Sequence, residues 1–242
     1  MTRAVNLVIA TTCYAIFFVT FLYLIAFVGN LPWVPTTVDR GSDARPLVAI
    51  LIDLALIAGF GVQHSVMARP AFKAQWTKIV PHALERSIYV LAASVMLILL
   101  FAFWHPLPGV FWSVQGIAAI ILWVLFLTGW LIVLLSTFLL NHFELFGLKQ
   151  AWINLTAHNA TEPHFRTPFF YRLVRHPLYL GFFIAFWATP VMTYSHLLLA
   201  IGMSVYMLIA IPIEEGDLID VFGDRYRDYQ RRVGRLLPKF GR

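Results

Sequence analysis

The sequence predicts an all-α integral membrane protein with about five to six transmembrane helices. Hydrophobic residues make up 60% of the chain and charged residues only 12%, a balance that excludes an ordinary soluble domain. The apolar residues are also gathered into runs of about 20, the length needed to cross a hydrocarbon core of roughly 30 Å. Composition and patterning therefore indicate the same class.

Four of these apolar runs are continuous. The first follows a single Arg3 and is too long for the core of a typical signal peptide, so we expect it to remain as a membrane helix. The predicted spans are Leu7–Val28, Leu47–Met67, Ile88–Trp104 and Val114–Leu140.

A fifth apolar region, Leu178–Ile213, is interrupted by the stretch "TPVMTYSH". Pro190 and its polar neighbours favour a tight turn, because proline ends a helix and hydroxyl side chains accept backbone hydrogen bonds. We therefore predict a hairpin of two short helices, which brings the number of crossings to six.

The basic residues predict the orientation. With the N-terminus in the cytoplasm and six crossings, all but two of the 18 Lys and Arg residues fall in cytoplasmic segments. The two exceptions are Arg40 and Arg45. We therefore expect both termini in the cytoplasm, in a bacterial inner membrane. Orientation also accounts for the net charge of +6 without a nucleic-acid partner.

The C-terminal stretch "EEGDLIDVFGDRYRDYQRRVGRLLPKF" is the one segment typical of a soluble helix. Its apolar and aromatic residues recur at steps of three and four, which places them on one helical face, with charges on the others. The sequence predicts one cytoplasmic amphipathic helix with this face: Leu218, Phe222, Tyr226, Tyr229 and Val233.

The stretch "YRLVRHPLYLG" places basic residues at the start of the predicted hairpin. Because the hairpin returns after Ile213, we expect Arg175, His176 and Tyr179 to lie beside the Glu214–Glu215 pair. Such a cluster supplies a cation for a carboxylate, anions for an amine or ribose hydroxyls, and aromatic rings for a sulfonium, the groups that S-adenosylmethionine needs. The alternative is that the arginines are membrane anchors and the glutamates their solvated counter-charges.

These motifs resemble the isoprenylcysteine carboxyl methyltransferase superfamily. "RHPLYLG", then "EE", then "FGDRYRDY" match its pattern in order over roughly the last 70 residues. The resemblance implies a pocket for S-adenosylmethionine at the cytoplasmic face. The residues that it implies for this pocket are Arg175, His176, Pro177, Tyr179, Gly181, Glu214, Glu215 and Tyr226.

Upstream, "FGVQHSVMARPAFK", "ERSIYVL" and "STFLLNHFELFGLKQ" resemble the methanethiol S-methyltransferase (NnrU-like) branch of this superfamily. The resemblance implies a methyltransferase that methylates a small thiol, converting methanethiol to dimethyl sulfide. Residues 1–140 would then form a four-helix region with the acceptor site, and 141–242 the cofactor region of one integrated domain. The open alternatives are a prenylcysteine carboxylate or phospholipid amine as acceptor, and a non-catalytic NnrU-type protein or a transporter. Oligomeric state is not predicted.

Methyl transfer to a thiol favours a proton acceptor, because the thiolate is the nucleophile and a free thiol has a pKa of about 8.5. We rank the candidates as His64, then His142, then Asp53, an ionisable residue inside a predicted span. Arg86 is a candidate for polarising the acceptor. Each histidine can equally be an interfacial residue with satisfied hydrogen bonds, Asp53 a structural partner of another helix, and Arg86 an anchor.

A metal site is not expected. The eight histidines are dispersed, and a single Cys13 excludes both an intrachain disulfide and a cysteine metal site.

Overall fold

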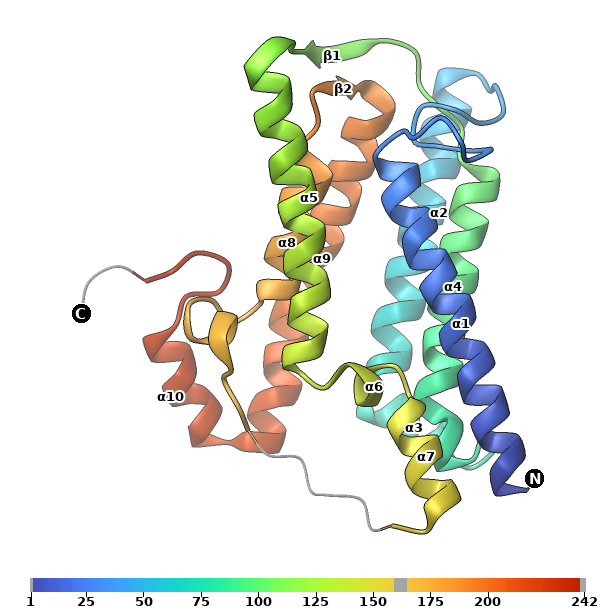
Figure 1. Cartoon of the computed structure of the whole chain (residues 1–242), viewed down its shortest axis with the longest axis vertical. Coiled ribbons are helices and arrows are strands. Elements are labelled where there is room, and N and C mark those ends of the chain that lie inside the picture. Colours follow the sequence, from blue (N-terminus) through green and yellow to red (C-terminus); the bar gives the residue numbers. More distant parts are fainter. Residues whose placement is uncertain (1, 159–164, 240–242) are drawn as a thin grey trace. The chain divides into compact units, whose positions relative to one another are not determined.

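A computed structural model of the chain describes residues 2–158 and 165–239 (Figure 1). The remaining residues of the predicted regions 1–140 and 141–242 lie outside the described residues. It is predominantly helical, with one two-stranded sheet of β1 and β2. The elements in chain order are α1 (Arg3–Val28), α2 (Pro46–Ala68), α3 (Pro70–Trp76), α4 (His82–Phe103), β1 (Val110–Ser113), α5 (Gly116–Leu139), α6 (His142–Leu145), α7 (Leu148–Thr156), the 3₁₀ helix η1 (Phe169–Arg172), α8 (Pro177–Trp187), β2 (Val191–Thr193), α9 (Tyr194–Phe222) and α10 (Asp224–Arg232).

Within the described part of the chain, five helices are long and apolar enough to cross a membrane: α1, α2, α4, α5 and α9. The predicted all-α membrane class is therefore confirmed. The helix α4 begins at His82, six residues before the predicted start, because polar residues form its first turns and escape a search for apolar runs. Proline occupies the first turn of α2, α3 and α8, where its missing N–H costs no helical hydrogen bond.

The chain forms two compact units that are not contiguous in sequence. The first unit contains α1–α4, α6, α7 and residues 193–199. The second contains α5, η1, α8, α10 and residues 200–222 of α9. The fourth long helix, α5, thus groups with the C-terminal part of the chain, whereas the predicted boundary at residue 140 placed it with α1–α4.

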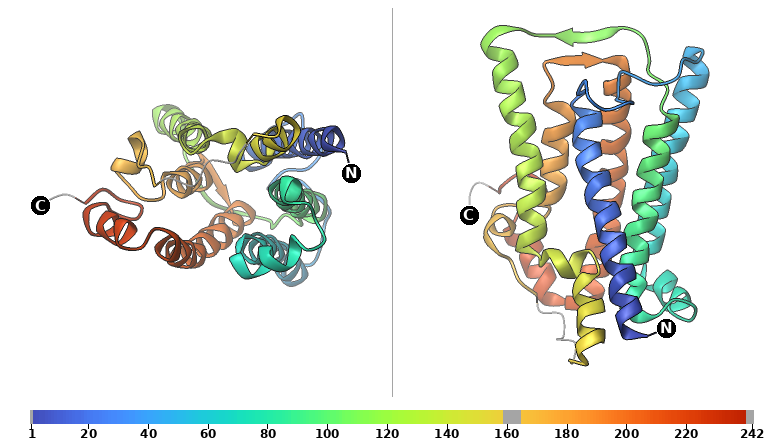
Figure 2. Two further views of the ribbon diagram at one scale, coloured as in Figure 1. Left: turned by 90° about the horizontal axis from the view of Figure 1, so that it is seen from below. Right: turned by 45° about the vertical axis from the view of Figure 1, so that its right-hand side comes forward.

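In the first unit, α1 and α4 pack together, and α7 packs against both (Figure 2). Buried Ala10, Leu84 and Ala151 form the apolar contact of these three helices. The amide of Asn6 also donates to Asn154 Oδ1 at 3.2 Å. Gly147, with a φ of 91°, lies where a Cβ atom would collide with Ser87, so the start of α7 requires glycine.

In the second unit, α5 and α8 lie side by side because each presents a glycine to the other (Figure 1). A Cβ atom on Gly129 would lie 2.6 Å from the backbone nitrogen of Ala185 and 2.7 Å from the carbonyl oxygen of Gly181. Removing side chains at a helix contact lets two backbones approach closely, as is common in membranes.

The predicted hairpin is present, and its side-chain pairs define an antiparallel register. At its start Arg175 pairs with Glu215, and one turn later Tyr179 pairs with Glu214. At its far end the Trp187 indole donates to Ser204 Oγ at 3.0 Å. The prediction of two short helices was wrong for the second arm, because α9 has 29 residues. The first arm, α8, has 11 residues and spans about 16 Å, which is too short to cross alone.

The predicted single tail helix was also wrong. The segment is divided at Gly223, where a φ of 57° ends α9 and α10 begins at Asp224. Glycine readily adopts a positive φ, and this conformation at Gly223 interrupts the helix. The apolar periodicity had predicted one continuous helix across this position. Tyr226 and Tyr229 are nevertheless buried, as a shared apolar face requires.

Candidate functional site

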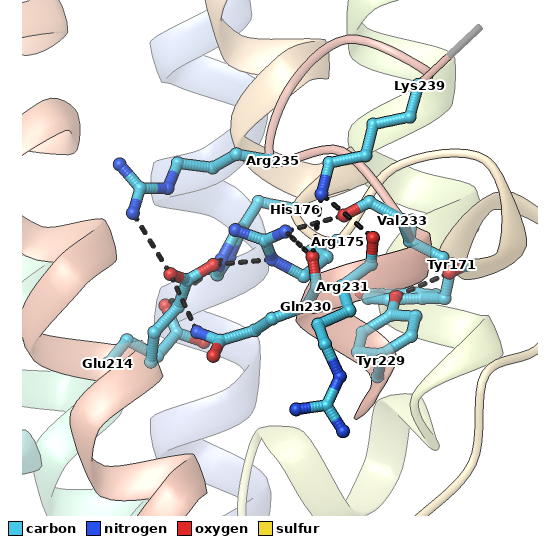
Figure 3. A network of polar contacts seen from close by, with 11 residues as sticks. Tyr171, Arg175, His176, Glu214, Tyr229, Gln230, Arg231, Val233, Arg235 and Lys239 are labelled. Atoms are coloured by element: carbon cyan, nitrogen blue, oxygen red, sulfur yellow. Dashed lines mark hydrogen bonds and ion pairs between the residues drawn. The ribbon is translucent and has the colours of Figure 1, made fainter. Parts of the chain in front are cut away.

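The centre of the polar cluster in the second unit is Glu215, a buried carboxylate near the end of α9. Figure 3 shows several side chains of this cluster, among them Arg175, His176, Gln230 and Arg235. Its Oε1 accepts from Arg175 Nε at 2.7 Å and lies 3.0 Å from His176 Nε2. Its Oε2 accepts from Gln230 Nε2 at 3.2 Å and Arg235 Nη2 at 3.1 Å. An ionised carboxylate has about four acceptor sites, so protein donors already fill Glu215.

Arg175 connects this carboxylate to the backbone that follows α10. Its Nη1 donates to the carbonyl oxygens of Gln230 at 3.1 Å and Val233 at 2.5 Å. Its own backbone N–H donates to Gly234 O at 2.8 Å, and the N–H of His176 donates to Arg235 O at 3.1 Å. A short backbone ladder therefore fixes the "RHP" segment against the residues after α10.

Glu214 has a different environment from its neighbour. Its side chain is 44% exposed, whereas that of Glu215 is 4% exposed. Glu214 Oε2 accepts from the Tyr179 hydroxyl at 3.0 Å and lies 4.0 Å from His176 Nδ1, beyond hydrogen-bond reach. The structure thus separates the paired glutamates into one saturated carboxylate and one that has acceptor capacity at the surface.

Aromatic rings pack beside these polar groups. Phe165 contacts the rings of Phe222, Tyr226 and Tyr229, with centroids 5.3 to 5.9 Å apart. The Tyr229 hydroxyl donates to Tyr171 O. Burial raises the pKa of Tyr229 to about 12, and it raises the pKa of Tyr226 further, so both phenols stay neutral at physiological pH.

Two of the predicted cofactor residues have evident structural positions. Pro177 is buried in the first turn of α8. Gly181 lies in the contact between α8 and α5 described above. The structure brings Arg175, His176 and Glu215 together, as the hairpin predicts.

In the first unit, the His64 ring lies against Tyr89 of α4. The Tyr89 hydroxyl is 2.8 Å from His64 Nε2, and the Phe60 ring stacks on the His64 ring with centroids 5.4 Å apart. Arg86, one turn before Tyr89 on α4, places its guanidinium 5.7 Å from the Tyr89 ring centroid. The structure therefore joins His64 and Arg86 through Tyr89, a residue that was not predicted.

His142 has a similar tyrosine partner but more aromatic surroundings. Its Nε2 lies 2.8 Å from the Tyr14 hydroxyl, and Tyr14, Phe143 and Phe146 contact the ring by their edges or faces. The side chain is buried, and burial lowers the pKa of His142. The ring is thus neutral at physiological pH.

Asp53 lies in a separate part of the first unit. It is fully buried, and its Oδ1 accepts the backbone N–H of His105, just beyond the end of α4, at 3.0 Å. About 16 Å of helix separates it from His64, as the sequence spacing requires. This position supports the structural role for Asp53.

Three further partners were not predicted from the sequence: Gln230 and Arg235, which contact Glu215, and Tyr14, which contacts His142. Each lies in a segment whose register against its partner depends on tertiary packing, so the spacing of residues along the chain does not identify it. Across residues 2–158 and 165–239, no group of three or more His, Cys, Asp or Glu side chains is arranged to hold a metal ion.

The fold and these clusters define a helical integral membrane protein with one exposed carboxylate in a basic, aromatic site. Comparison with known proteins identifies its family. The chain is 52% identical over 227 residues to methanethiol S-methyltransferase 1 of Bradyrhizobium diazoefficiens, covering 93% of this chain and 79% of the relative. It is 49% identical over 239 residues to the methanethiol S-methyltransferase of Mycobacterium tuberculosis, covering 98% of each chain.

The chain therefore belongs to the methanethiol S-methyltransferase family, which confirms the predicted resemblance and the assignment as a methyltransferase. A more distant relative is nurim of Rattus norvegicus, at 29% identity over 222 residues, with 83% of this chain and 82% of the relative covered. No family model matches the chain, and no solved structure matches it.

Proposed function

We propose that the chain transfers a methyl group from S-adenosylmethionine to methanethiol and releases dimethyl sulfide. The observation that carries the proposal is the identity of about one half, over nearly the whole chain, to proteins named methanethiol S-methyltransferase. When bound, S-adenosylmethionine supplies an electrophilic methyl group on a sulfonium. The acceptor sulfur attacks this methyl in line as the carbon–sulfonium bond breaks.

The second unit has groups that fit this donor. Glu214 is exposed enough to accept hydrogen bonds from an ammonium group or ribose hydroxyls, and the Tyr179 hydroxyl orients its carboxylate. Aromatic faces near Tyr226 suit an adenine or a sulfonium. Because Glu215 is saturated, its proposed role is to hold Arg175, His176 and Arg235 in position. Pro177 and Gly181 support α8.

For the acceptor, the proposed base is His64. The Tyr89 hydroxyl at Nε2 and the Phe60 ring fix the orientation of the imidazole. Arg86, held over the Tyr89 ring, contributes a positive field that favours a thiolate. His142 is the second candidate, and its position among aromatic rings favours a packing role.

The proposed location is a bacterial inner membrane, with both termini and the cofactor site in the cytoplasm. The five long apolar helices and the distribution of Lys and Arg support it. Cysteine-accessibility labelling of Arg40→Cys and Arg227→Cys in intact cells tests the orientation. Arg40→Cys is expected to react with an impermeant reagent and Arg227→Cys to react only after lysis.

Headspace gas chromatography tests the acceptor directly. Cells that express the chain and are fed methanethiol are expected to release dimethyl sulfide above the vector control. Isothermal titration of the purified protein with S-adenosylhomocysteine tests the donor separately. Product without measurable donor binding would contradict the cofactor assignment, and donor binding without product would contradict the acceptor.

A further inference from the structure

A cavity of about 290 Å³ in the second unit borders the Glu214–Glu215 cluster without including either glutamate. It is lined by Phe165, Thr167, Arg172, Tyr229, Arg232 and Val233. Two arginines, a threonine and two aromatic residues thus line one space, with no Asp or Glu among the lining residues. This composition suits an anion that has an apolar neighbour.

Both arginines are held by backbone contacts that leave their forked ends available. Arg172 Nε donates to Thr167 O and Arg232 Nε donates to Asp228 O, each at 3.3 Å. Within residues 2–158 and 165–239, neither guanidinium has a carboxylate within salt-bridge distance. Two other arginines of α10 differ, since Arg227 pairs with Asp224 and Arg231 with Asp228.

Exposed apolar side chains lie close in sequence to the lining residues. Phe169 is 65% exposed, Leu173 55% and Leu237 75%. Phe169 also has a φ of 35°, a left-handed conformation that is costly for a bulky residue. Exposed apolar residues interleaved with arginines are typical of a surface that inserts into the headgroup region of a membrane.

We propose that Arg172 and Arg232 form a binding site for the phosphate of an anionic phospholipid headgroup. The two guanidinium forks contact the phosphate oxygens, Thr167 adds a hydroxyl, and Phe169 and Leu173 contact the lipid beside the headgroup. This site does not depend on methyl transfer.

Native mass spectrometry of the full chain released from mixed micelles tests the site. The probe is phosphatidylglycerol, with phosphatidylcholine as the neutral comparison. Each arginine removed is expected to weaken phosphatidylglycerol retention about fivefold, so that R172Q/R232Q loses roughly 20- to 30-fold. The matched control R227Q, from the same helix but paired with Asp224, is expected to stay within about twofold of the parent.

Three outcomes would overturn the proposal. The first is equal loss of retention in R227Q, which would indicate general surface charge. The second is complete displacement of the lipid by an equal concentration of inorganic phosphate, which would identify free phosphate as the ligand. The third is unchanged lipid retention in R172Q/R232Q with lost S-adenosylhomocysteine binding, which would assign the cavity to the methyl donor. R172K/R232K keeps both charges and is expected to recover most retention, which controls for misfolding.

Discussion

Arg175 and Glu215 form a buried ion pair at 2.7 Å although 40 positions separate them in the chain. Each partner has further fixed contacts: Arg175 with two backbone carbonyl oxygens, and Glu215 with His176, Gln230 and Arg235. The adjacent Glu214 shares none of these contacts except proximity to His176. The same substitution is therefore expected to have different effects at these two adjacent glutamates.

Glu215→Gln is expected to destabilise the folded protein by about 3 kcal/mol, because it leaves the buried Arg175 guanidinium without its counter-charge. Glu214→Gln is expected to change stability by less than about 0.5 kcal/mol, since its side chain is substantially exposed. It should instead weaken S-adenosylhomocysteine binding by about tenfold or more. Thermal unfolding and calorimetry in the same detergent separate the two effects. Equal loss of stability in both variants would contradict this division of roles.

Tyr89→Phe is expected to lower turnover about fivefold to tenfold, because it removes the hydroxyl that orients His64. His64→Ala is expected to lower turnover roughly 10²- to 10⁴-fold, with donor affinity unchanged in both variants. The matched control is Tyr14→Phe, which removes the equivalent hydroxyl from His142 at the same 2.8 Å distance. A larger effect of Tyr14→Phe on turnover would make His142 the base.

Gly129→Ala is expected to destabilise the second unit by about 1–3 kcal/mol, because its Cβ atom would overlap the backbone of α8. The contrasting variant is Gly216→Ala on α9. Apart from the backbone of its own helix turn, no atom of the described residues lies within 4 Å of the corresponding Cβ position, so alanine should stabilise the helix by about 0.5–1 kcal/mol. Opposite shifts in unfolding temperature are the expected result. A lower unfolding temperature for Gly216→Ala would show that this face of α9 is covered.

Protonation of His142 is expected to lower the free energy of unfolding in acid. Burial lowers the pKa of the folded-state imidazole, so the unfolded chain binds more protons as pH drops through its ordinary pKa of about 6.5. The contribution of the neutral ring is therefore complete above that pH and is lost as pH falls toward the lowered value. Unfolding temperatures between pH 8 and 5 should decline less steeply in His142→Phe than in the parent. Identical slopes would exclude this contribution.

Much of the fold could be predicted because the bilayer imposes a length and composition on each span. The contact between Arg175 and the Glu214–Glu215 pair could also be predicted. A tight turn near Pro190 makes the second arm of the hairpin run back along the first, so its end lies beside the start of the first arm. Tyr89 and Tyr14 could not be identified as partners of the histidines, because helix-to-helix register depends on side-chain packing. The break between α9 and α10 at Gly223 could not be predicted, because the aromatic residues on both sides of it keep helical spacing.

The backbone ladder between the "RHP" segment and Gly234–Arg235 has a consequence for biosynthesis. The donors and acceptors that complete the Arg175–Glu215 pair come from residues 230–235. A nascent chain can therefore insert its apolar helices while translation continues, but the cluster assembles only after residue 235 leaves the ribosome. A chain arrested at residue 229 would keep every membrane helix and lack the ordered site.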